Sequence, residues 1–105
     1  MSHRKAILIS NPKTGRYAAR RKSIQDLVAA LKSLGLDVSL KLTSGPGDAT
    51  HIAAEATKNG TTDVIVAGGD GTINEVIQGM VGSNLRLGIL PRGTAGSRAL
   101  RPLPR

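Results

Sequence analysis

Three glycines surround a single carboxylate in the segment Gly68-Gly69-Asp70-Gly71-Thr72. Glycine lets a backbone turn with positive φ and approach a phosphate without a Cβ clash. Where a helix begins directly after such a segment, its free N–H groups and its dipole favour a bound anion. A carboxylate beside phosphates repels them unless a cation lies between, so Asp70 indicates a Mg²⁺-linked role, direct or through water. The segment therefore predicts phosphate-binding chemistry.

The same residues also allow a structural interpretation, a tight turn followed by a helix capping box of Thr72 and Glu75. We expect the capping box in either case and assign Glu75 mainly a structural role, while Asp70 remains the functional candidate. Two other phosphate-binding motifs are excluded. Asn74 stands where the dinucleotide motif G-x-G-x-x-G requires its third glycine, and the chain lacks the Gly-Lys-Ser or Gly-Lys-Thr of a P-loop.

Four short runs are typical of strands, at residues 6–10, 38–42, 63–67 and 85–90. Three helical stripes lie between them, with apolar residues mostly three or four positions apart. Their members are Ile24, Leu27, Val28, Leu31 and Leu34, then Ile52, Ala53 and Ala56, then Ile73, Val76, Ile77 and Met80. The order βαβαβαβ predicts an α/β fold of three layers, a parallel sheet with helices on both faces.

The loops that follow the strands are the expected place for a ligand, because ligands of such sheets bind at the carboxyl ends of the strands. These loops cover residues 11–15, 43–48, 68–72 and 91–94. We expect Asp48, in the second loop, to cap the following helix. The glycine-rich segment is the third loop, so it lies at the predicted binding edge.

Composition narrows the possible functions. The chain has no cysteine, which excludes disulfides, thiol nucleophiles and cysteine metal sites and favours an intracellular location. His3 and His51 lie far apart, so we predict no zinc site. Apolar runs span only a few residues, against about 20 for a membrane helix, and the N-terminus lacks the apolar core of a signal peptide. We therefore expect a cytoplasmic protein.

The net charge of +8 is concentrated at the two ends of the chain. Residues 1–22 carry seven Lys or Arg and residues 86–105 carry five Arg, both without an acid, whereas the middle has three basic and seven acidic residues, a balance of 3 − 7 = −4. Basic surfaces attract nucleotide phosphates, nucleic acid or anionic lipid headgroups, and solvated charge that maintains solubility is an equal alternative. Tyr17 is the only aromatic residue, so we predict no nucleic-acid partner.

Four motifs follow one another in order over residues 6–95. They are Ser10-Asn11-Pro12-Lys13-Thr14-Gly15, Thr43 with Gly47-Asp48-Ala49, Gly68-Gly69-Asp70-Gly71-Thr72-Ile73-Asn74-Glu75-Val76, and Leu87-Gly88-Ile89-Leu90-Pro91 with Gly93-Thr94-Ala95. Together they resemble the catalytic domain of diacylglycerol and related bacterial lipid kinases. Gly-Gly-Asp-Gly also marks NAD kinases and phosphofructokinases, but Asn74-Glu75-Val76 and the Pro-x-Gly-Thr-Ala segment favour lipid kinases.

The resemblance implies transfer of the γ-phosphoryl group of MgATP to a lipid hydroxyl at a membrane surface, with ATP and Mg²⁺ as cofactors. Residues 1–95 would form the nucleotide-binding domain. Asp70 matches the family's essential aspartate and is the implied catalytic and metal-associated residue. Positions matching the family's ATP site are Asn11, Pro12, Lys13, Thr14, Gly15, Thr43, Gly68, Gly69, Asp70, Gly71, Thr72, Ile73, Asn74 and Thr94. An NAD kinase-like enzyme and a nonenzymatic nucleotide-binding module remain alternatives.

The sequence departs from the family after residue 95. The family continues with Asn-Asp and an aromatic residue, whereas this chain has Gly96-Ser97-Arg98. The family's second, β-rich domain, which supplies the general base, has no counterpart here. For the Arg- and Pro-rich tail of residues 96–105, truncation, a shifted reading frame and loose order remain open. We expect marginal stability and association, as a homodimer or aggregate, through the fourth strand and the tail.

Overall fold

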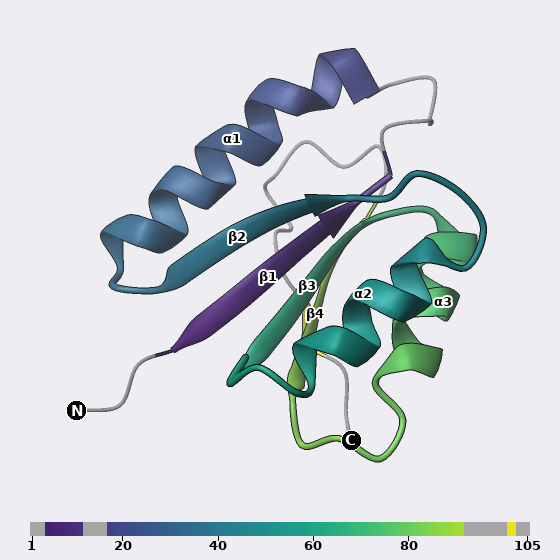
Figure 1. Cartoon of the computed structure of the whole chain (residues 1–105). Helices are drawn as coiled ribbons and strands as arrows, with labels where there is room; N and C mark the ends of the chain where they lie inside the picture. The colour runs from purple at the N-terminus through teal and green to yellow at the C-terminus, as the bar shows by residue number, and fades with distance from the viewer. Residues whose placement is uncertain (1–3, 12–16, 92–100, 103–105) are drawn as a thin grey trace.

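The strands of the predicted α/β fold form a single sheet (Figure 1). The computed structural model describes residues 4–11, 17–91 and 101–102, and side chains within 4–11 and 24–90. Along the sheet the strand order is β2-β1-β3-β4-β5, with β1 to β4 parallel and β5 antiparallel to β4. The strands are β1 (Lys5–Ser10), β2 (Asp37–Leu42), β3 (Asp63–Gly68), β4 (Arg86–Pro91) and β5 (Arg101–Pro102).

Helices cover both faces of the sheet, as the sequence predicts. They are α1 (Tyr17–Ser33), α2 (Asp48–Ala56) and α3 (Asp70–Gly79). The chain steps from β1 outward to β2, then returns past β1 to β3 and continues to β4. Because such crossovers are right-handed, reversing the direction moves the helix to the other face. Hence α1 packs on one face, and α2 and α3 lie together on the opposite face (Figure 1).

Each face has its own aliphatic core. The α1 core contains Ala6, Leu8, Ile24, Leu31, Val38, Ile65 and Ala67. The core on the opposite face contains Ile7, Ile9, Ala49, Ala53, Ala56, Val64, Val66, Val76 and Leu87. All six residues of β3 are buried, as is usual for a central parallel strand that helices cover on both faces. Burial of one such Val, Leu or Ile side chain stabilises the fold by roughly 1.5–3 kcal/mol.

Alanine and glycine bring α2 and α3 close together. The predicted inward side of α2 is confirmed, since Ala53 and Ala56 are fully buried. A Cβ placed on Gly79 of α3 would lie 2.8 Å from the Cβ of Ala53 and would also clash with the carbonyl oxygen of Thr50. Thr50 Oγ1 donates a hydrogen bond of 2.9 Å to the carbonyl oxygen of Glu75. This close approach fixes the position of α3 against α2.

An acidic residue ties three segments together at the amino edge of the sheet. Asp63 is only 7% exposed. Its Oδ2 accepts hydrogen bonds from Arg4 Nη2 at 2.9 Å and Nε at 3.2 Å, and its Oδ1 accepts one from Arg86 Nε at 2.8 Å. Two half-exposed arginines thus satisfy one buried carboxylate, joining β1, β3 and β4 at the edge opposite the predicted ligand loops.

Two predicted helix caps are wrong. The N-cap of α2 is Gly47 at φ 84°, a left-handed conformation that glycine adopts easily, and Asp48 is the first helical residue. The Asp48 carboxylate instead accepts hydrogen bonds from Ser44 N–H at 2.8 Å and Ser44 Oγ at 3.1 Å. The N-cap of α3 is Gly69, with no side-chain cap bond, so Thr72 and Glu75 cannot form a capping box there.

One further prediction needs revision. The third helical stripe included Ile77, but Ile77 is 39% exposed, whereas Val76 is fully buried in the core. In the tail, Arg101 and Pro102 pair with β4 in antiparallel register. Gly35 follows the end of α1 and adopts φ 93°, a conformation that glycine often supplies after a helix. Among the described residues, no helix is long and apolar enough to cross a membrane.

Candidate functional site

Three of the predicted ligand loops leave the carboxyl edge of the sheet from adjacent strands. Asn11 follows β1, residues 43–47 follow β2, and Gly69 follows β3. The N–H of Thr43 donates to the carbonyl oxygen of Ser10 at 2.9 Å, which continues the β1–β2 ladder by one residue. The connection that follows β1 leads to β2 on one side, and the connection that follows β3 leads to β4 on the other side. The gap between β1 and β3 is therefore a topological switch point, where such sheets form a crevice.

A cavity of about 420 Å³ lies at this switch point. Its lining residues are Asn11, Thr43, Gly45, Pro46, Ala49, Gly71, Thr72 and Glu75. They come from three parts of the chain that are far apart in the sequence: the end of β1, the stretch from the end of β2 to the start of α2, and the first turns of α3. The structure thus brings together Asn11, Thr43, Gly71 and Thr72, which the sequence analysis proposed as site residues.

The N-terminus of α3 reaches the cavity through Gly71 and Thr72. No side chain caps this end of the helix. The first N–H groups of a helix have no partner inside it, and the helix dipole adds partial positive charge there. This end of α3 therefore has the chemistry to bind an anion such as a phosphate group.

The glycines of this segment are needed for space and not for an unusual backbone. Gly68, Gly69 and Gly71 all lack positive φ, so the expectation of a left-handed turn is wrong. A Cβ on Gly68 would lie 3.1 Å from the Cβ of Thr72, a tight contact. A Cβ on Gly71 would meet nothing within 4 Å. The missing side chain at Gly71 leaves open space beside the cavity, as a close approach to a ligand would require.

Asp70 is the first residue of α3 and is exposed. It does not line the cavity, and neither do Gly68, Gly69, Ile73 or Asn74. Its side chain is accessible, and Gly71 and Thr72, which follow it in the chain, line the cavity. Residues 12–15 and Thr94, also proposed for the site, lie outside the described residues.

Glu75 joins α3 to the second ligand loop. Its Oε2 accepts a hydrogen bond of 3.2 Å from the N–H of Gly47, and its carboxylate lines the cavity. Glu75 therefore has the structural role assigned from the sequence, but its partner is the N-cap of α2 and not its own helix. The bond links residues 28 positions apart. It holds the start of α2 against α3 beside the cavity.

Four lining residues were missed as site residues by the sequence analysis. Gly45 and Pro46 belonged to the expected ligand loop 43–48 but were not named as site residues. Ala49 was quoted only within a family motif, and Glu75 was assigned a structural role. The position of the Thr43 loop at the binding edge was the available signal for the first two. For Ala49 and Glu75, membership of the site depends on how α2 packs against α3, which short-range sequence patterns do not specify.

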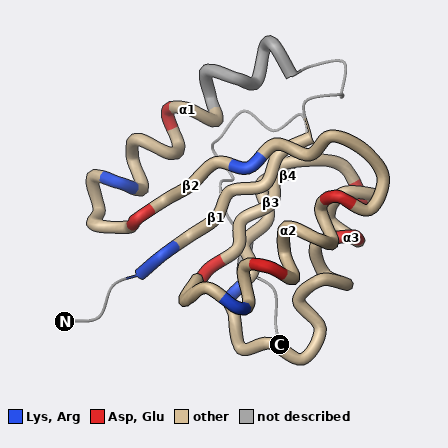
Figure 2. The backbone as a smooth tube through the Cα atoms, in the orientation of Figure 1, with Lys and Arg blue, Asp and Glu red and all other residues tan. Residues whose placement is uncertain are grey.

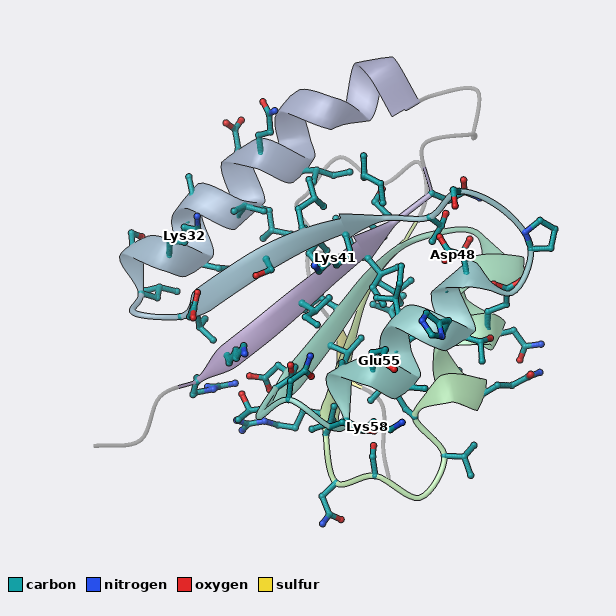
Figure 3. The ribbon with its side chains drawn as sticks, in the orientation of Figure 1. Lys32, Lys41, Asp48, Glu55 and Lys58 are labelled. Atoms are coloured by element: carbon teal, nitrogen blue, oxygen red, sulfur yellow. The ribbon has the colours of Figure 1, made fainter. Side chains whose placement is uncertain are left out.

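The charged groups near the cavity suit a cation that arrives with its ligand. Within the described residues, no three His, Cys, Asp or Glu side chains converge as a metal-binding group. Mg²⁺ commonly uses one or two carboxylates together with substrate phosphates and water. One accessible carboxylate, Asp70, beside a helix N-terminus fits this mode of binding. Figure 3 shows a second carboxylate, Asp48, at the start of α2, which also lies at the carboxyl edge of the sheet.

Comparison with known proteins shows the family of the chain. The model of the family described as "Diacylglycerol kinase catalytic domain" matches residues 5–101. A diacylglycerol kinase from Mycobacterium tuberculosis is 37% identical over 95 residues, covering 90% of this chain and 30% of that protein. The Klebsiella pneumoniae protein named "Probable lipid kinase YegS-like" is 40% identical over 96 residues, covering 90% of this chain and 31% of that protein.

The fold agrees as well. The crystal structure of a diacylglycerol kinase from Bacillus anthracis superimposes with a TM-score of 0.74 at 31% identity, over 90% of this chain and 32% of that chain. The chain therefore spans about a third of the length of the relatives it matches. With a family model that matches nearly the whole sequence and a fold shared with a solved relative, the chain belongs to the diacylglycerol kinase catalytic domain family.

Proposed function

We propose that this chain supplies the ATP-binding part of a lipid kinase, which transfers the γ-phosphoryl group of MgATP to a lipid hydroxyl. The observation that carries the proposal is the cavity at the β1–β3 switch point, into which the uncapped N-terminus of α3 opens. Membership of the diacylglycerol kinase catalytic domain family supports the reaction class. Names of the similar proteins, diacylglycerol kinase and lipid kinase, support a lipid acceptor.

Positioning and charge neutralisation dominate phosphoryl transfer, so the binding residues carry most of the chemistry. The N–H groups of Gly71 and Thr72 would bind phosphate oxygens at the start of α3. Asn11 and Thr43 would contact the nucleotide from the opposite wall of the cavity. The remaining members of the proposed site are Pro12, Lys13, Thr14, Gly15, Gly68, Gly69, Ile73, Asn74 and Thr94.

Asp70 is the proposed catalytic residue. Its exposed carboxylate at the N-terminus of α3 would hold Mg²⁺, directly or through water, beside the phosphates. Bound Mg²⁺ would neutralise the charge of the phosphates. Without a cation, an anionic ligand in this cavity would face the carboxylate of Glu75, which lines it, and would lie near Asp70, the residue next to Gly71 in the chain. Binding of the nucleotide should therefore depend on Mg²⁺.

Calorimetric titration of the purified chain with ATP tests the nucleotide site. We expect MgATP to bind, and Asp70→Ala to weaken the affinity by about tenfold or more, because loss of a charge-assisted contact costs roughly 1.5–3 kcal/mol. Glu55→Ala, which removes an exposed carboxylate from the outer side of α2, is the matched control and should not change the affinity. Equal affinity of wild type and Asp70→Ala would refute the role of Asp70. Failure of the folded wild-type chain to bind MgATP would refute the nucleotide site.

The acceptor requires a separate assay. Radiolabelled ATP is offered with diacylglycerol in mixed micelles, with other lipid alcohols, or with NAD, to the chain and to a form as long as its relatives. Label in a lipid phosphate supports the proposal, whereas label in NADP would favour an NAD kinase. Transfer only by the long form would identify the chain as a nucleotide-binding part. We place the enzyme in the cytoplasm, at the membrane surface where its lipid substrate resides.

A further inference from the structure

β2 forms one edge of the sheet, at the end opposite to β5 (Figure 1). Within the part of the chain that the structure describes, no strand pairs with its outer side. The outer N–H and C=O groups of an edge strand are available to pair with another strand. Folded proteins usually protect such an edge with charged residues, proline, a bulge or a covering segment.

The two faces of β2 differ in character. Successive side chains of a strand point to opposite faces, so Asp37, Ser39 and Lys41 share one face, and all three are exposed. Val38, Leu40 and Leu42 share the face that α1 covers. Val38 is only 5% exposed, but Leu40 and Leu42 remain 38% and 44% exposed. β2 therefore has an unpaired edge and two exposed leucines. Its acidic and basic positions are coloured on the tube in Figure 2.

The sequence of β2 is complementary to itself in one antiparallel register. If two copies of β2 pair antiparallel about Ser39, the residue numbers of each opposed pair add up to 78. Asp37 then faces Lys41 of the partner subunit, and Lys41 faces the partner's Asp37. On the other face Val38 lies opposite the partner's Leu40, and Leu42 opposite the partner's Leu36. Every charge meets an opposite charge, and every apolar residue meets an apolar one.

Neighbouring registers lose this match. Moving the centre to Val38 places Asp37 opposite Ser39 and Lys41 opposite Gly35, and moving it to Leu40 places Lys41 opposite Ser39. If one strand slips so that the opposed residue numbers add up to 77 or 79, apolar residues lie opposite polar ones on both faces. Cross-strand pairs of opposite charge or of apolar residues each stabilise a sheet by roughly 0.2–1 kcal/mol. The match about Ser39 thus selects a second copy of this chain over an unrelated strand.

We propose that β2 is a homodimer interface, at which two chains pair antiparallel about Ser39 and extend their sheets into one. The two-fold axis passes through the Ser39 pair, so the apolar residues of both copies join on the α1 face and the two Asp37–Lys41 ion pairs form on the other. The candidate nucleotide cavity is not part of this interface, since Thr43 is the closest of its lining residues and lies beyond the end of β2. The sequence analysis expected association at the other edge, through β4 and the tail.

Charge reversal tests the register. Analytical ultracentrifugation over a concentration series should show a dimer of the 10.9 kDa chain. Asp37→Lys alone or Lys41→Asp alone should raise its dissociation constant by about tenfold or more, because each creates two like-charge pairs. The double variant Asp37→Lys/Lys41→Asp should restore the dimer, and an equimolar mixture of the two single variants should form the heterodimer. Both residues are exposed, so circular dichroism should report unchanged folding in every variant.

A cross-link gives an independent measure of the same pairing. The chain has no cysteine, so Ser39→Cys introduces a single thiol at the proposed axis. Directly opposed residues of antiparallel strands have Cα atoms about 4.5–5.5 Å apart, within the range of a disulfide. Mild oxidation should therefore trap a covalent dimer with Ser39→Cys but not with Asn84→Cys, an exposed control in the turn before β4.

The outcomes separate the possible interfaces. Restoration of the dimer in the charge swap and in the mixture, with cross-linking at position 39, supports the proposal. A strictly monomeric wild-type chain would overturn it. A dimer that is insensitive to both single reversals would also overturn it and would indicate another surface, with the β4 edge as the first alternative.

Discussion

At the scale of single residues, two glycines of the Gly-Gly-Asp-Gly segment, Gly68 and Gly71, have different surroundings. Gly68 accommodates Thr72 at a distance that leaves little room for a Cβ, whereas the space beside Gly71 is empty and adjoins the cavity. Neither residue has positive φ. Gly68 is therefore explained by packing within the chain, whereas for Gly71 we propose that the approach of a ligand requires the open space.

Gly71→Ala tests this distinction. Ala suits the helical conformation of residue 71 better than Gly does, so the free energy of unfolding should stay the same or rise by up to about 1 kcal/mol. The affinity for MgATP should nevertheless fall by about tenfold or more, because the methyl group occupies space beside the cavity. Thermal melting and calorimetric titration give the two values. A variant that binds MgATP as tightly as wild type would show that the open space is not used by the ligand.

At the scale of elements, the contact between α2 and α3 shapes the site. Thr50 bonds to the carbonyl oxygen of Glu75, and the Glu75 carboxylate bonds to the N–H of Gly47. Both bonds join α3 to the α2 segment, so the two helices and the loop before α2 form one wall. The depth of the cavity thus depends on residues such as Gly79 that do not line it.

Gly79→Ala should separate these helices. Its Cβ would clash with the carbonyl oxygen of Thr50, a backbone atom that cannot rotate away, so α3 must shift. We expect a loss of about 1–3 kcal/mol in the free energy of unfolding, as for other overpacked contacts. Urea denaturation measures the loss, with Gly71→Ala as the control for the same change within the same helix. Wild-type stability of Gly79→Ala would contradict the close packing of α2 against α3.

At the scale of the whole molecule, the two edges of the sheet along the strand direction have different roles. The carboxyl edge carries the candidate site, and the amino edge carries the bridge of Arg4, Asp63 and Arg86. The bridge joins β1, β3 and β4 at a distance from the cavity. Its contribution should be to stability, with no direct effect on the ligand.

Asp63→Ala measures the strength of this bridge. The buried carboxylate makes charge-assisted hydrogen bonds to both arginines, whose heads are about half exposed and therefore partly screened. We expect a loss of about 1–2 kcal/mol and a fall in Tm of roughly 5 °C or more, with unchanged MgATP affinity per folded molecule. Glu55→Ala, on the exposed side of α2, should leave Tm unchanged. An equal Tm for Asp63→Ala would show that the ion pairs contribute nothing net.

The order of elements and their buried sides could be predicted from the sequence because both depend on local periodicity. Residues 63–67 were identified as a strand, and Ala53 and Ala56 as part of an apolar helical stripe, and all of them are buried. The ligand edge followed from the same order, since parallel strands place their carboxyl ends together. This order placed the loops that contain Asn11, Thr43, Gly71 and Thr72 at one edge, and the family resemblance assigned these four residues to the nucleotide site.

Partners distant in the sequence were decided only by the tertiary structure. Glu75 was expected to bond within its own helix, but the packing of α3 against α2 brings the N–H of Gly47 to its carboxylate. Ala49 became part of the cavity for the same reason, and the short strand at Arg101 formed because β4 offered a free side for pairing. A local pattern specifies which side of an element is apolar. Which other element covers that side depends on crossovers and packing that involve the whole chain.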